Sequence, residues 1–185
     1  MKERGAVKKR LSGQLLLAHP ALREPTFKRT VILMSVHDAD GAMGVVLNRP
    51  LNRQLGEFSP DFALGPLAGV PVYGGGPVAT EQLLLVSWQW LKGEAAFQLH
   101  FGIEPAKAAA LIGDPGLTVR AFLGYSGWGR GQLDSEMRLD TWIATPVDGD
   151  WLGRADGVEL WRGILGSLDP ELKFLASEPD DPSVN

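Results

Sequence analysis

The chain has 185 residues, of which 44% are hydrophobic and 22% are charged, and this composition is that of an ordinary globular protein rather than a disordered one. It contains no cysteine, which excludes disulfide scaffolds, thiol catalysis, zinc fingers and iron-sulfur sites. The net charge of -4 provides no overall attraction to nucleic acid or to anionic lipid.

The two ends of the chain carry opposite charge. Five basic residues stand against one acidic residue in the first ten positions, whereas the last 17 positions hold five acidic residues against one lysine. We therefore expect a basic N-terminal segment over residues 1–10, one domain over residues 11–176 and an acidic tail over residues 177–185. The longest uncharged run, Phe62–Thr80, contains eight glycines and prolines, which argues against a membrane helix and predicts a soluble, cytoplasmic protein.

The first part of the chain predicts three aliphatic strands, at Leu11–Ala18, Thr30–His37 and Ala42–Leu47. The segment Asp38–Gly41 predicts a hairpin turn between the second and third strands, because aspartate tolerates turn geometry and glycine supplies a positive φ. His37, Asp38 and Asp40 are also metal-ligand types, but the third carboxylate and the distal glutamate of a calcium loop are missing. We expect a turn there and no metal site.

Further strands are predicted at Gln82–Trp90, Leu117–Leu123 and Thr141–Thr145. Helices are predicted at Pro105–Ile112 and Gln132–Leu139, and a third begins at Asp156, where Glu159 completes a capping-box pattern. An early antiparallel hairpin followed by helices indicates an α+β fold in a single domain.

The triple glycine Gly74-Gly75-Gly76 has two interpretations. It forms either a tight structural turn or a loop whose exposed amides hold a phosphate or another anion. If Gly75 and Gly127 need unusual backbone angles, the substitutions Gly75→Val and Gly127→Val should each lower the free energy of unfolding by more than about 1 kcal/mol.

Ser126 lies in a segment, Gly124–Trp128, that is similar to a nucleophile elbow. The second glycine of such an elbow is replaced by Trp128, and all three histidines precede the serine, which is the wrong chain order. We expect a glycine-rich bend here rather than a serine hydrolase.

Five polar residues form a further candidate set: His19, Asn48, Arg49, Gln132 and Glu136. The Arg49 guanidinium, at a predicted strand end, suits one of two partners. It either pairs with an internal carboxylate, for which Glu136 is the candidate, or clamps an external carboxylate or phosphate in two-point fashion.

Five blocks of the sequence together carry a family resemblance: Leu11–Pro20, Pro25–Val31, His37–Pro50, Tyr73–Val78 and Leu123–Glu136. In order and separation they resemble the bacterial YqgE/AlgH family. The resemblance implies an α+β fold whose mostly antiparallel sheet is bifurcated and folded into a pseudo-barrel with flanking helices. It implies no established activity, although members are often labelled transcriptional regulators.

Three hypotheses about function remain. The first is a cytoplasmic binding or regulatory protein that holds a small anion or a protein partner at its glycine-rich loops, without a cofactor. The second is an enzyme that uses His19, Arg49 and Glu136 as base, anion clamp and acid. The third is direct DNA binding, against which the acidic body and the lack of a helix-turn-helix pattern speak. The candidate ligand-binding residues are His19, Asn48, Arg49, Gly74, Gly75, Gly76, Ser126, Gln132 and Glu136.

Overall fold

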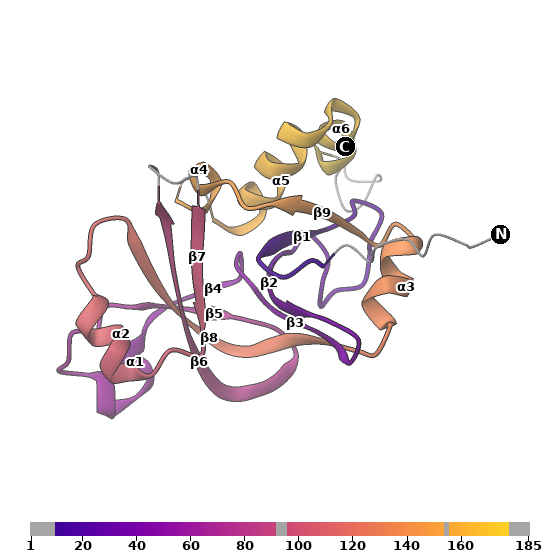
Figure 1. The fold of residues 1–185 in the computed structure, drawn as a ribbon. Coiled ribbons are helices and arrows are strands. Elements are labelled where there is room, and N and C mark those ends of the chain that lie inside the picture. Colours follow the sequence, from indigo (N-terminus) through magenta and orange to yellow (C-terminus); the bar gives the residue numbers. More distant parts are fainter. Residues whose placement is uncertain (1–9, 92–95, 154–155, 178–185) are drawn as a thin grey trace.

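A computed structural model of the chain describes residues 10–91, 96–153 and 156–177 (Figure 1). The strands are β1 (Gln14–Ala18), β2 (Val31–His37), β3 (Gly41–Val46), β4 (Pro50–Gln54), β5 (Pro71–Gly74), β6 (Val78–Leu91), β7 (Ala96–Phe101), β8 (Leu117–Gly129) and β9 (Trp142–Pro146). The α-helices are α1 (Leu55–Phe58), α2 (Pro105–Leu111), α3 (Gln132–Arg138), α4 (Gly149–Leu152), α5 (Gly157–Leu168) and α6 (Pro170–Ser177). The predicted α+β class is confirmed.

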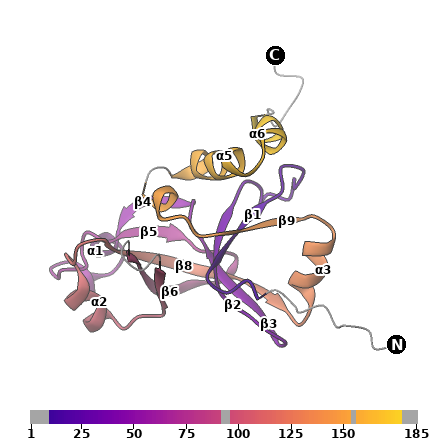
Figure 2. The ribbon, with the colours of Figure 1, turned by 45° about the horizontal axis from the view of Figure 1, so that its top comes forward.

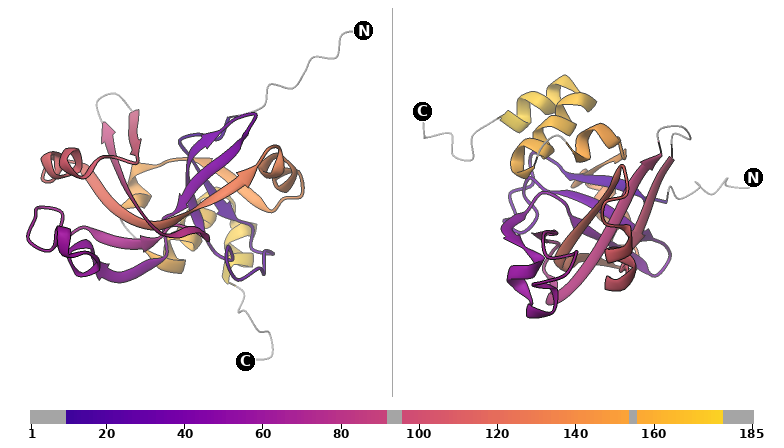
Figure 3. Two further views of the ribbon diagram at one scale, coloured as in Figure 1. Left: turned by 90° about the horizontal axis from the view of Figure 1, so that it is seen from below. Right: turned by 90° about the vertical axis from the view of Figure 1, so that its left-hand side faces the viewer.

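Within these residues the strands form one nine-stranded sheet that divides along β8. The strand order is β4-β5-β8-β3-β2-β1-β9, with β6 beside β8 and β7 beside β6. The first half of β8 pairs with β5 in parallel and with β6 in antiparallel register, whereas its second half pairs with β3. Figure 3 shows the two groups of strands diverging from β8. The bifurcated sheet is therefore confirmed, and its strand path is open from β4 to β9.

The strands β1, β2 and β3 are buried on both faces. Leu15 and Leu17 of β1 belong to one core cluster, while Leu16 and Ala18 belong to another, as expected when successive side chains point to opposite faces. Helices α5 and α6 cover the first face (Figure 2), and α3 packs against the second. This arrangement explains the continuous aliphatic runs in the sequence, because a strand with two buried faces needs no alternation.

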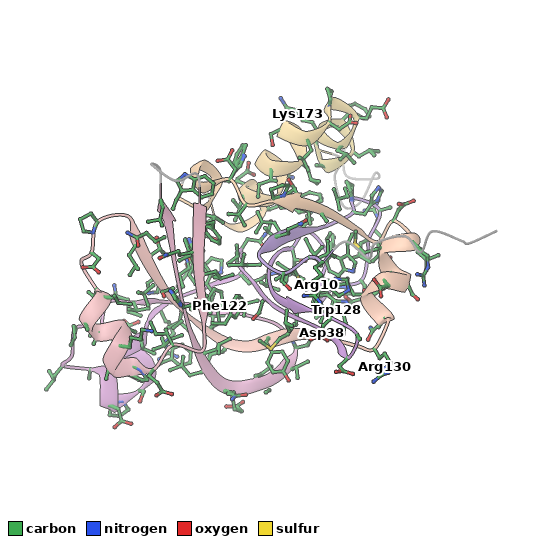
Figure 4. All side chains as sticks on the ribbon, viewed as in Figure 1. Arg10, Asp38, Phe122, Trp128, Arg130 and Lys173 are labelled. Atoms are coloured by element: carbon green, nitrogen blue, oxygen red, sulfur yellow. The ribbon has the colours of Figure 1, made fainter. Side chains whose placement is uncertain are left out.

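A third core cluster lies between α1, α2 and the strands β5, β6 and β8. Two aromatic residues of β8 show how far this strand reaches. Phe122 packs with the cluster under α5, whereas Trp128 packs with the cluster beside α3, and the two lie in different parts of the molecule (Figure 4).

Two sequence expectations need correction. The segment Gly124–Trp128 is not a bend, because it continues β8 as a strand paired with β3. The strands β4, β5 and β7 were not expected.

Residues 1–9 and 178–185, which make up most of the two predicted terminal segments, lie outside the described residues. Among the described helices, none is long and apolar enough to span a membrane.

Gly75 occupies a crowded junction between three strands. Its N–H donates to the Leu123 carbonyl of β8, and its own carbonyl accepts the N–H of Val46 at the end of β3. A Cβ atom there would lie well inside van der Waals contact of the Gly124 carbonyl oxygen and 3.1 Å from the Cβ of Phe122. Neither Gly75 nor Gly127 has a left-handed φ, so close approach, and not an unusual backbone angle, is what requires glycine at position 75.

We expect Gly75→Ala to lower the free energy of unfolding by about 1–3 kcal/mol, because the added methyl group forces the strands apart. Gly127→Ala is the matched control: the nearest atom to its Cβ is Cε2 of the Tyr125 side chain, at 3.3 Å, which can shift. Urea denaturation of both variants measures the difference. Equal midpoints for the two variants would contradict the crowding at Gly75.

Candidate functional site

The loop between β1 and β2, residues 19–30, is where several of the predicted motifs meet. Glu24 holds the loop from within: its Oε1 and Oε2 accept the N–H groups of Thr26 and Phe27 at 2.9 and 3.0 Å. A hydrogen bond from the Thr26 side chain, together with these backbone bonds and the nearby Arg49 charge, lowers the pKa of Glu24. The loop thus has an ordered conformation that its own hydrogen bonds stabilise.

Asn48 ties this loop to the rest of the fold. Its Oδ1 accepts the N–H of Val31 at 2.9 Å, and its Nδ2 donates to the carbonyls of Arg29 and Gly157, both at 2.9 Å. The side chain is buried, and these bonds join the start of β2, the loop and the start of α5. Asn48 is therefore a structural residue whose amide faces the protein interior.

Arg49 lies on the outer side of the same loop. Its Nη2 donates to the carbonyl oxygens of Pro25, Thr26 and Lys28 at 3.4, 3.3 and 3.1 Å. The residue is exposed, and Nε and Nη1 have no partner among the described residues. The loop carbonyls thus fix one edge of the guanidinium and leave the other edge available.

Glu136, on α3, has a different set of partners. Its Oε2 accepts the indole N–H groups of Trp128 and Trp142 at 2.8 and 2.7 Å, and its Oε1 accepts Nε2 of Gln132 at 2.9 Å. The predicted pairing of Arg49 with Glu136 is therefore wrong. Both carboxylate oxygens already serve to hold two tryptophan rings and the start of α3.

The two tryptophans support the loop because their rings pack against Phe27. The Phe27 ring lies 6.4 Å from the Trp128 ring and 5.6 Å from the Trp142 ring, centroid to centroid, and the two indoles contact each other edge to face at 5.8 Å. Glu136 and Gln132 thus act on the loop indirectly, as parts of the aromatic support under Phe27.

His19 begins the loop, and its ring is used locally. The Nδ1 atom accepts the N–H of Ala21 at 3.1 Å. In the part of the chain that the structure describes, no hydrogen bond or ion pair joins His19 to Arg49 or to Glu136. The three side chains proposed for catalysis therefore do not form a connected set.

The glycine-rich segment contributes small pocket-lining residues to the candidate site rather than free amide donors. The N–H groups of Gly74 and Gly75 donate to the carbonyls of Arg49 and Leu123, so both are committed to the sheet. Ser126 is fully buried, and its Oγ donates to the Gly75 carbonyl at 3.3 Å. Gly74 and Gly76 do, however, line an open pocket next to Arg49.

That pocket, here called the Arg49 pocket, is where the structure brings three of the predicted residues together. It has a volume of about 320 Å³ and is lined by Thr26, Val46, Arg49, Leu51, Gly74, Gly76 and Pro77. The adjoining loop carries Arg23, Lys28 and Arg29 against Glu24, so the neighbourhood is basic on an acidic protein. Its chemistry is that of a guanidinium beside small, apolar walls.

Sequence reasoning missed the loop residues Thr26 and Phe27, although both lie in one of the blocks that carry the family resemblance. Their role is visible only when the contacts of Arg49, Trp128 and Trp142 are known. Among the described residues, no group of three or more histidine, aspartate or glutamate side chains could hold a metal ion.

Comparison with known proteins now places the chain in a family. A family model described as AlgH-like matches residues 15–173. The chain belongs to the AlgH-like family. It is 35% identical over 191 residues to a UPF0301 protein of Streptomyces coelicolor, with 95% of each chain covered. All five sequence blocks and the Arg49 pocket lie almost wholly within the matched residues, and the predicted resemblance is confirmed.

Two solved structures are similar to this AlgH-like chain. The solution structure of the AlgH protein of Pseudomonas aeruginosa gives a TM-score of 0.66 at 26% identity and covers 98% of this chain and 100% of its own. The crystal structure of protein DIP2367 of Corynebacterium diphtheriae gives a TM-score of 0.71 at 21% identity, covers 96% of this chain and 95% of its own, and supports the fold alone.

Proposed function

We propose that this AlgH-like protein is a cytoplasmic binding protein without catalytic activity, and that it holds a small anion in the Arg49 pocket. Any regulatory role would then be exercised through the bound anion. The observation that carries the proposal is the partly occupied guanidinium of Arg49. The loop carbonyls hold Nη2, Nε and Nη1 have no partner among the described residues, and Arg49 lines an open pocket.

An anchored guanidinium suits this purpose physically. Arginine binds carboxylates and phosphates through two parallel N–H···O bonds, and a fork whose orientation is already fixed loses less entropy on binding. The adjoining loop holds three basic residues against one acidic residue, on a chain whose net charge is -4. The pocket volume of about 320 Å³ is at the small end of the range for ligand sites, which favours a compact anion.

The enzyme hypothesis receives less support from the geometry. A general base must reach the proton that it abstracts, and an acid must present a free oxygen. His19 Nδ1 accepts a backbone N–H, and both oxygens of Glu136 accept hydrogen bonds from the aromatic support. Arg49, by contrast, lines an open pocket.

The test measures the thermal stabilisation of the protein by inorganic phosphate, pyrophosphate, succinate and citrate, each titrated at constant ionic strength. A ligand at 100 times its Kd adds about 2.7 kcal/mol to the stability of a protein that binds it only when folded. We expect one or more of these anions to raise the melting temperature, and Arg49→Ala to abolish the effect. Loss of the exposed carbonyl contacts should itself cost only about 1 kcal/mol.

Arg130→Ala is the matched control, because Arg130 is an exposed arginine whose Nη2 already pairs with Asp40 at 2.7 Å. It should leave the anion effect unchanged. Arg49→Lys should retain a weakened response, since lysine keeps the charge without the two-point geometry. No stabilisation by any of the four anions, or stabilisation that survives Arg49→Ala, would refute the proposal.

A further inference from the structure

A second hollow lies beside β4 and shares no lining residue with the Arg49 pocket. Arg49 and Leu51 line the Arg49 pocket, whereas Asn52 and Arg53 line the second hollow, together with Glu57, Tyr73 and Asp156. Its volume of about 490 Å³ falls within the range of small-molecule sites, roughly 300–1,000 Å³. We call it the Tyr73 pocket.

The cationic side of this pocket is Arg53, which is anchored twice. Its guanidinium carbon lies 4.2 Å from the centroid of the Phe58 ring, and its Nη2 donates to the Glu57 carbonyl at 2.8 Å. Nε and Nη1 have no partner among the described residues. Stacking and a hydrogen bond thus hold the guanidinium in place while part of its donor edge stays open.

An irregularity in β4 supports this placement. The pairing register of β4 with β5 shifts between Pro50 and Arg53, and Asn52 has a left-handed φ of 54°. In a regular strand two consecutive side chains point to opposite faces, but here Asn52 and Arg53 both line the pocket. Bulges of this kind redirect side chains and are frequent beside functional sites.

The anionic side of the pocket consists of two carboxylates, and each accepts hydrogen bonds from neighbouring groups of the protein. Asp156 accepts the Tyr73 hydroxyl through Oδ2 and the Gly157 N–H through Oδ1, both at 2.8 Å. Glu57 accepts the Gln54 N–H through Oε2 at 2.8 Å. Because a carboxylate offers about four lone-pair sites, both side chains keep acceptor capacity for a ligand.

Tyr73 gives the Asp156 carboxylate a rigid backing. The phenol ring is buried, and the guanidinium carbon of buried Arg120 lies 4.4 Å from its centroid. Burial raises the pKa of Tyr73 to about 12, against the lowering effect of Arg120 and with a further increase from Asp156. The hydroxyl therefore stays protonated at neutral pH and remains a donor to Asp156.

We propose that the Tyr73 pocket binds a small zwitterion, namely a free α-amino acid, with the carboxylate of the ligand on Arg53 and its ammonium group between Asp156 and Glu57. A purely anionic ligand would face two carboxylates, and a purely cationic ligand would face the guanidinium. A zwitterion satisfies both signs of charge through charge-assisted hydrogen bonds. The site is separate from the Arg49 pocket and does not depend on the function proposed for that pocket.

The experiment titrates the full-length protein with each of the twenty common L-amino acids by calorimetry, supported by thermal shift. We expect at least one amino acid to bind with a Kd of about 1 mM or tighter. The N-acetyl derivative of that amino acid, which lacks the ammonium charge, and its amide, which lacks the carboxylate, should each bind at least about tenfold more weakly. Failure of all twenty amino acids, or a derivative that binds as well as its parent, overturns the proposal.

Variants locate the site. Arg53→Ala should weaken the amino acid at least about tenfold while leaving the binding of its amide nearly unchanged, because the amide makes no carboxylate contact. Asp156→Asn should weaken the amino acid similarly and spare the N-acetyl derivative; asparagine is also a good helix N-cap, so α5 stays intact. Arg130→Ala is the control that should bind normally. An amino acid that binds with unchanged affinity to both Arg53→Ala and Asp156→Asn also overturns the proposal.

Discussion

Replacing Glu136 by alanine is expected to lower the free energy of unfolding by about 3–5 kcal/mol, because it leaves the indole N–H groups of Trp128 and Trp142 and the Gln132 amide without their acceptor. The Phe27 ring rests on these two indoles, so the loop between β1 and β2 should loosen as well. Urea denaturation measures the stability, and near-ultraviolet circular dichroism reports on the tryptophans. This would be a large share of the stability of a domain of this size.

Two controls separate this effect from a simple loss of charge. Glu136→Gln keeps one carbonyl acceptor and should lose less stability than Glu136→Ala. Glu81→Ala removes a carboxylate from an exposed position of β6 and should change the stability by no more than about 0.5 kcal/mol. If Glu136→Ala and Glu81→Ala had the same stability, the structural role assigned to Glu136 would be refuted.

The second large effect is expected at Asn48. Asn48→Ala should lower the free energy of unfolding by about 2–4 kcal/mol, because the Val31 N–H and the carbonyls of Arg29 and Gly157 all lose a partner beside the core. Asn48→Asp should also destabilise the protein, since it keeps the acceptor for Val31 but turns a negative charge toward two carbonyl oxygens. Urea denaturation again measures both changes.

Gln98→Ala is the matched control for Asn48, because it removes an exposed amide from β7. It should leave the stability within about 0.5 kcal/mol of the parent protein. An Asn48→Ala variant as stable as Gln98→Ala would show that water replaces the three bonds without loss.

The elements that the sequence predicted are those with a local signal. The Asp38 side chain closes the hairpin as expected, with its Oδ1 accepting the N–H groups of Asp40 and Gly41 at 2.8 and 3.3 Å. Asp156 caps α5, and Leu160, Ile164 and Leu165 form its buried stripe, although Leu168 is partly exposed. Aliphatic runs located β1, β2 and β3 to within a few residues.

The strands that were missed lack such a signal. In β4, four of the five residues are exposed, so there is no alternation of apolar and polar side chains to detect. The short strand β5 lies inside a run of glycines and prolines that indicates loops. Both exist because β8 supplies a pairing partner to β5, a long-range contact that local patterns do not encode.

The candidate site was predictable only in part. Arg49 at a strand end was recognised as an anchored cation, yet its partners are backbone carbonyls of a loop more than 20 positions earlier. Glu136 is predicted from the sequence as a candidate ligand-binding residue, but its partners in the structure are indole N–H groups, which a search for opposite charges does not find. Residue types suggested which side chains matter, whereas the fold decides what each one contacts.

The sharing of β8 between the two groups of strands has a consequence for the integrity of the chain. A cut or an inserted segment within β8 would expose the pairing groups of β5, β6 and β3 at once, and unpaired strand edges are templates for association with other copies. Neither group of strands can therefore be excised as an autonomous module. We expect a fragment that carries one of the two pockets to expose apolar surface and to aggregate rather than fold.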